Sequence, residues 1–145
     1  MEQRTLPRFF EEAVAKFPDN VFILEKKSKE YRGTTYRDFR NEVYTFSAGL
    51  QSLGLSKGDR CALLSEGRND WVLSELAILY TGAVNVPLSV KIDELDDLKF
   101  RLDHSGCRFI IVSGRQAEKI RRIKDDLPEL EKIIFLDGND SLEAD

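Results

Sequence analysis

The chain has 145 residues, of which 41% are hydrophobic and 33% charged, and its formal net charge is −4. This length fits one domain or a piece of a larger one, and the acidic balance argues against nucleic acid as the main partner. No window contains the roughly 18 consecutive apolar residues of a membrane span, and the charged start does not form a signal peptide, so we expect a cytoplasmic protein with at most peripheral membrane association.

The first thirty or so residues predict a helix followed by a hairpin. Apolar residues at helical spacing over Leu6–Phe17 indicate a short amphipathic helix, and Pro7 suits its first turn. Two short runs, Val21–Glu25 and Lys29–Arg32, flank a polar turn. They predict a small antiparallel hairpin.

The next segment predicts a long helix with one apolar face. Thr34 or Thr35 is a suitable N-cap, and Gly54 is a suitable end. A polar residue in place of Phe46 is expected to remove most of the net stability of the domain, because this face would be buried. The apolar face recurs at spacings of three and four residues: Tyr36, Phe39, Val43, Phe46, Leu50 and Leu53.

The central stretch predicts two parallel strands joined by a helix. Arg60–Ser65 and Ala83–Pro87 are short apolar runs of the kind found in strands buried on both faces. Between them, Asn69 is the expected N-cap of a helix over Trp71–Tyr80, which is apolar on nearly every side. A strand, a helix and a strand within about 30 residues indicate a right-handed crossover.

The last third continues the alternation of helices and strands. Helices are expected over Asp93–His104 and Arg115–Lys124, and strands over Phe109–Val112 and Ile133–Leu136. The sequence therefore predicts an α/β fold with a mainly parallel sheet, helices on both faces and a small N-terminal hairpin. Residues 1–138 would form this unit, residues 139–145 would be a loose polar tail, and the order of the strands stays open.

Ligands of open parallel sheets bind at the carboxyl ends of the strands, so the residues after each strand are the candidate sites. The first strand end, Ser65–Gly67, lacks the G-x-G-x-x-G pattern of a dinucleotide site. Asp70 would also occupy the positive helix terminus that a phosphate needs. A classical dinucleotide-binding fold is therefore disfavoured.

Two basic residues at later strand ends are candidate phosphate contacts. Arg115 follows Ser113 and Gly114 at the start of a helix, where backbone amides and a guanidinium suit a phosphate. Lys91 lies just past the second central strand, where an ordinary surface lysine is the better explanation from the residues alone. The last strand end reads as a plain turn. Because His104 is the only histidine, His-paired metal sites and Ser-His relays are excluded within this chain.

Five short motifs stand out along the chain: Thr35–Phe39, Gly54–Asp59, Asn69 with Trp71, Tyr80–Leu88 (YTGAVNVPL), and Ser105 with Gly106. In these motifs, their order and their spacing, the chain resembles the N-terminal portion of the AMP-forming acyl-CoA synthetases, and most closely the long-chain fatty-acid–CoA ligases. The resemblance runs from about residue 5 to residue 137.

The resemblance implies a ligase with a two-step reaction. A fatty-acid carboxylate attacks the α-phosphate of ATP, with Mg²⁺ shielding charge, and gives acyl-AMP and pyrophosphate. The thiol of coenzyme A then displaces AMP and takes the acyl group. The family's phosphate loop, aromatic-Thr-Glu motif, ribose-binding aspartate and C-terminal lysine are absent from this sequence. We therefore expect a fragment of a larger adenylate-forming fold that has no catalytic or metal-binding residue, binds no cofactor alone and needs the remainder of its own chain. Lys91 and Arg115 approximately match positions that contact coenzyme A phosphates in some family members.

Two other interpretations stay open at this point. The chain could be a free-standing α/β interaction module that kept the fold without the chemistry. A small flavodoxin-like nucleotide binder is disfavoured, because the loop after the first central strand lacks the expected phosphate-binding residues.

Overall fold

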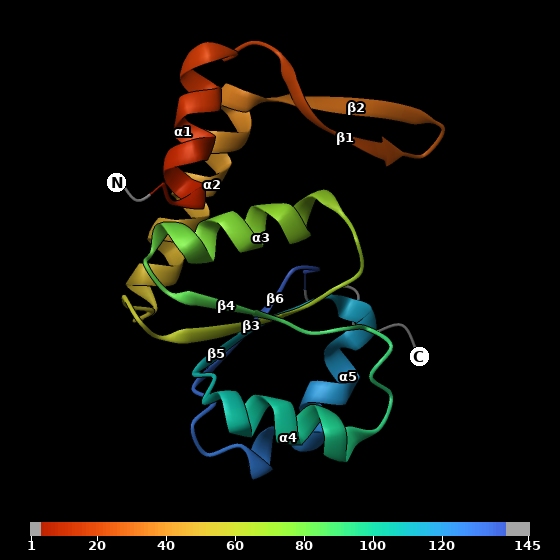
Figure 1. The fold of residues 1–145 in the computed structure, drawn as a ribbon. Coiled ribbons are helices and arrows are strands. Elements are labelled where there is room, and N and C mark those ends of the chain that lie inside the picture. Colours follow the sequence, from red (N-terminus) through yellow and green to blue (C-terminus); the bar gives the residue numbers. More distant parts are fainter. Residues whose placement is uncertain (1–3, 139–145) are drawn as a thin grey trace.

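The computed structural model describes residues 4–138, which form a two-stranded hairpin and a four-stranded sheet flanked by helices (Figure 1). The predicted tail, residues 139–145, lies outside the described residues. In chain order the elements are α1 (Leu6–Lys16), β1 (Val21–Lys27), β2 (Glu30–Thr35), α2 (Tyr36–Ser52), β3 (Arg60–Leu64), α3 (Asn69–Tyr80), β4 (Val84–Pro87), α4 (Leu95–Ser105), β5 (Phe109–Val112), α5 (Gly114–Ile123), the short 3-10 helix η1 (Lys124–Asp126) and β6 (Lys132–Phe135).

The main sheet has the strand order β4-β3-β5-β6, and every neighbouring pair is parallel. Helix α3 covers one face together with the C-terminal end of α2, while α4 and α5 cover the other face (Figure 1). All four residues of β5 are fully buried, as expected for a central parallel strand. The predicted α/β class is therefore confirmed, and the structure supplies the strand order that the sequence left open.

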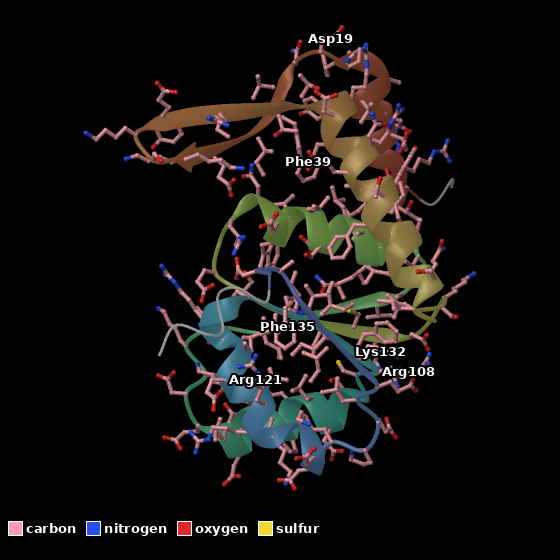
Figure 2. The ribbon with its side chains drawn as sticks, turned by 180° about the vertical axis from the view of Figure 1, so that it is seen from behind. Asp19, Phe39, Arg108, Arg121, Lys132 and Phe135 are labelled. Atoms are coloured by element: carbon pink, nitrogen blue, oxygen red, sulfur yellow. The ribbon has the colours of Figure 1, made fainter. Side chains whose placement is uncertain are left out.

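The N-terminal elements form a second apolar cluster on the outer side of α3. Phe10 and Val14 of α1 meet Phe39 and Val43 of α2, and half-buried residues of α3 and the hairpin pack against them. Figure 2 shows Phe39 between the hairpin and α3. Helix α3 thus lies between this cluster and the sheet and is covered on both sides, as its evenly apolar sequence requires.

The apolar face predicted for α2 is only partly buried. Leu50 and Val43 join Phe39 in the core, whereas Phe46 is half-buried and Leu53 is 48% exposed. Leu53 is the C-cap, so its side chain leaves the end of the helix and not its buried face. Full burial of Phe46 is therefore not found: its side chain packs against the sheet-side core from a half-buried position, and the fully buried aromatic residue of this helix is Phe39.

Several predicted boundaries move by one or two residues. The clearest correction is at α3, where Arg68 and not Asn69 is the N-cap, without a side-chain capping bond. The hairpin is longer than expected, because β2 continues through the threonine pair to Thr35. Thr35 nevertheless caps α2 as predicted: its hydroxyl accepts from the Asp38 amide at 3.2 Å and donates to the Asp38 carboxylate at 2.9 Å.

Candidate functional site

A cleft of about 540 Å³ opens at the carboxyl edge of the main sheet, lined by Glu66, Arg68, Gly114, Arg115 and Asp137. These residues follow β3, β5 and β6, whose carboxyl ends meet at this edge. The chain leaves β3 through α3 on one face and enters β5 from α4 on the other. The cleft therefore lies where the direction of strand addition reverses, which is the usual ligand position in open α/β sheets.

Arg68 connects two walls of the cleft through two carboxylates. Its Nη1 donates to Asp137 Oδ1 at 2.8 Å, and its Nη2 donates to Asp70 Oδ2 at 2.5 Å. The hydrogen bond to Asp137 is the main reason why the pKa of Arg68 is raised, and the charge of Asp70 adds to it. This guanidinium ties the start of α3 to the end of β6.

Asp137 also caps helix α5. Its Oδ2 accepts from the Gly114 amide at 2.6 Å, and this bond, followed by the one from Arg68, lowers the pKa of the Asp137 carboxyl. The sequence predicted that backbone amides at this helix start suit a phosphate. In the structure the Gly114 amide is occupied by Asp137, so an anionic ligand in this cleft would meet the Arg115 side chain first.

Glu66 also lines the cleft and is held by α5. Its Oε1 accepts from Gln116 Nε2 at 2.6 Å. Burial alone would raise the pKa of Glu66, but the Gln116 bond and the nearby Ser113 hydroxyl outweigh it, and the pKa is lowered. Glu66 is therefore ionised at neutral pH.

The structure places the two predicted phosphate contacts differently. Arg115 lines the cleft and is exposed, and no hydrogen bond or ion pair to another described residue engages its guanidinium. Lys91 is exposed on the loop 88–93 and does not line the cleft. The Lys119 ammonium joins that loop to α5, since it donates to the carbonyls of Val90 and Ile92 at 3.2 and 2.8 Å.

Two residues of the cleft, Arg68 and Asp137, were not predicted from the sequence as site residues. Arg68 stands three residues beyond the predicted strand, and Asp137 was interpreted as part of a plain turn. The available signal was topological: parallel strands place all their carboxyl ends on one edge, so an acid after the fourth strand faces the residues after the first. The single histidine lies elsewhere, on α4, where its ring stacks on Phe100 at 5.4 Å.

The described part of the chain limits the chemistry of the cleft. Over residues 4–138, no group of three His, Cys, Asp or Glu side chains could hold a metal ion. Likewise, none of the helices in this range combines the length and the apolar character needed to cross a membrane. The cleft can offer a guanidinium to an anion, and two ionised carboxylates, Glu66 and Asp137, restrict how close that anion can come.

Comparisons with known proteins agree with this fold. The chain is 24% identical over 136 residues to 4-hydroxybutyrate–CoA ligase 2 of Metallosphaera sedula, covering 94% of this chain and 24% of the relative. It thus spans about a quarter of the length of that curated relative.

Two solved structures share the fold. The N-terminal domain of FACL13 from Mycobacterium tuberculosis superposes with a TM-score of 0.85 at 21% identity, over 98% of this chain and 36% of that one. A long-chain-fatty-acid–CoA ligase (FadD1) from Archaeoglobus fulgidus has a TM-score of 0.86 at 16% identity, over 95% of this chain and 28% of that one.

A comparison with protein families gives a match of similar extent. Residues 10–145 match the family described as AMP-binding enzyme, which is nearly the whole chain and includes every residue that lines the cleft. The fold shared with the two solved structures fits this assignment. The chain belongs to the AMP-binding enzyme family.

Proposed function

We propose that this chain is the N-terminal structural subdomain of a ligase that activates a fatty acid with ATP to acyl-AMP and transfers the acyl group to coenzyme A. The observation that carries the proposal is the family match over residues 10–145. The name of the structurally similar FadD1 supports a long-chain acid as the substrate class. A cytoplasmic location is part of the same proposal.

The described residues offer a candidate contact for coenzyme A but no ligand cluster for Mg²⁺. The guanidinium of Arg115 is exposed at the cleft and suits a phosphate of coenzyme A. When coenzyme A is bound, its thiol accepts the acyl group. Lys91, on the adjacent loop, is proposed as a second contact. For Mg²⁺ the described residues hold no ligand cluster, so we assign the metal and the triphosphate of ATP to residues beyond this chain.

The surface of the N-terminal elements supports a further partner, the remainder of the same polypeptide. Helix α1 leaves the apolar side chains of Leu6 and Phe9 exposed beside a groove of about 250 Å³ between α1 and α3. Contiguous apolar surface of this kind marks an interaction site. We assign it to segments that follow these residues in the intact enzyme.

The 145-residue chain alone is expected to catalyse no ATP–pyrophosphate exchange with any fatty acid. Acyl-adenylate formation needs dense stabilisation of charge around the α-phosphate, and one guanidinium does not supply it. Radiolabelled pyrophosphate incorporation into ATP measures the exchange, with the intact enzyme as the positive control. Exchange by the chain alone would show that it contains the catalytic centre and would refute the subdomain proposal.

Arg115→Ala in the intact enzyme is expected to weaken coenzyme A binding about tenfold, the effect of one charge-assisted contact. Isothermal titration measures the dissociation constant for coenzyme A. Arg121→Ala is a matched control, because Arg121 lies two turns along the same helix and stacks on Phe135 at 5.4 Å (Figure 2). Equal affinities for Arg115→Ala and the wild type would remove Arg115 from the binding site.

A further inference from the structure

Lys119 makes an unusual set of contacts for a lysine on a helix. Its Nζ lies 3.2 Å from the carbonyl oxygen of Val90, 2.8 Å from that of Ile92 and 3.0 Å from Asp93 Oδ1. An ammonium has three donors, so all three are used. The side chain is half-buried, in contrast to an ordinary solvated surface lysine.

The two carbonyls belong to the residues on either side of Lys91. The ammonium therefore holds both neighbours of Lys91 against α5, the helix that begins beside Arg115. The rest of the loop supports the same shape, because Ser89 accepts from the amides of Lys91 and Ile92, both at 3.2 Å. The peptide that carries Lys91 is fixed relative to the helix that carries Arg115.

We propose that Lys119 is a positioning residue that holds the loop of Lys91 at a fixed position relative to Arg115, so that the two cations can bind one phosphate-bearing ligand. The proposal rests on the proposed function, which names coenzyme A as that ligand. Lys119 itself does not contact the ligand, since its three donors face the loop. Its contribution to binding is the pre-organisation of a loop that would otherwise lose conformational freedom on binding.

Hydrogen exchange tests the contacts between Lys119 and the loop 88–93 without a measurement of activity. In the 145-residue chain, Lys119→Met keeps the aliphatic stem and removes the three donors. We expect the amides of the loop 88–93 to exchange faster, while those of β5 are unchanged. Lys99→Met is the matched control, because Lys99 lies on α4 and its ammonium pairs with Asp126 of η1 at 2.9 Å and not with this loop. Unchanged exchange in the loop overturns the proposal.

Kinetics of the intact enzyme test whether these contacts of Lys119 contribute to the use of coenzyme A. Lys119→Met is expected to raise the KM for coenzyme A about fivefold, as one coupled contact does, and to leave kcat and the KM for ATP within about twofold. In a Lys91→Met background the same change should have no further effect, because Lys119 acts through Lys91. Lys99→Met should leave all three parameters unchanged.

The outcomes separate the two proposals. If Lys91→Met raises the KM for coenzyme A but Lys119→Met does not, the positioning role is overturned and the coenzyme A contact stands. If Lys119→Met acts equally in both backgrounds, it does not act through Lys91, and the proposal is again overturned. If neither substitution at Lys91 nor at Arg115 changes that KM, the coenzyme A contact itself is wrong.

Discussion

Phe39→Ala is expected to lower the free energy of unfolding by about 3–5 kcal/mol, the cost of removing a buried phenylalanine from a core that cannot collapse around the cavity. The Phe39 side chain is 1% exposed. Its ring lies 5.0 Å from that of Phe22 and 6.3 Å from that of Phe10, both edge-on. The substitution therefore removes contacts of α2 with both α1 and the hairpin.

Urea unfolding followed by circular dichroism measures this loss. Phe100→Ala is the control, because Phe100 is 62% exposed on α4 and should change stability by no more than about 0.5 kcal/mol. A loss below about 1 kcal/mol for Phe39→Ala would mean that the N-terminal cluster does not contribute to the cooperative core. Since the whole stability of a domain is about 5–15 kcal/mol, the expected loss is a large part of it.

Asp137→Ala is expected to cost about 2–3 kcal/mol, because it removes the acceptor of two charge-assisted hydrogen bonds. The Gly114 amide and the Arg68 guanidinium lose their partner together, at 2.6 and 2.8 Å in the native cleft. The end of β6 is then no longer tied to the starts of α3 and α5. Urea unfolding at pH 7 measures the loss.

The effect of Asp137 should depend on pH in a defined direction. Its folded-state pKa is lowered, first by the Gly114 amide and then by Arg68. Its stabilisation is therefore complete above the unfolded-state pKa of about 3.9 and is lost as the pH falls through the lower folded-state pKa. The stability difference between the wild type and Asp137→Ala should narrow as the pH is taken from 5 towards 2, in roughly that window.

A surface ion pair provides the comparison for Asp137. Asp19 lies 2.9 Å from Arg37 but is 78% exposed, at the end of the molecule farthest from the sheet (Figure 2). Asp19→Ala should cost no more than about 1 kcal/mol. If Asp137→Ala costs as little, or if its cost does not change on acidification, the cleft carboxylate is not the acceptor described above.

The elements with a strong periodic signal were predicted almost without error. The strand Phe109–Val112 agrees residue for residue, because a short apolar run between a helix-ending glycine and a polar turn has few alternatives. Predicted boundaries that lack a glycine or a polar turn differ from the observed ones: the helix expected from Asp93 begins at Leu95. The cap of α3 was misplaced because the pairing of Arg68 with acids, one of them distant in sequence, decides the local conformation there.

Only a part of the candidate site could be predicted from the sequence. Arg115 was identified from the residues around it, since a basic residue after Ser-Gly at a helix start is a local pattern. Its neighbours in the cleft were not, because Asp137 lies 69 residues from Arg68 and 23 from Gly114 in the sequence. Only the parallel register of β3, β5 and β6 brings their carboxyl ends together.

The sequence by itself determined the class of fold, the succession of helices and strands, and the family resemblance, because these depend on hydrophobic periodicity and on short motifs that lie within one element or turn. The tertiary structure alone decided the order of the strands, which aromatic residue is buried, which acid caps α5, and that Lys119 holds the loop of Lys91. These features depend on contacts between segments far apart in the chain, and no local pattern records which segments will meet.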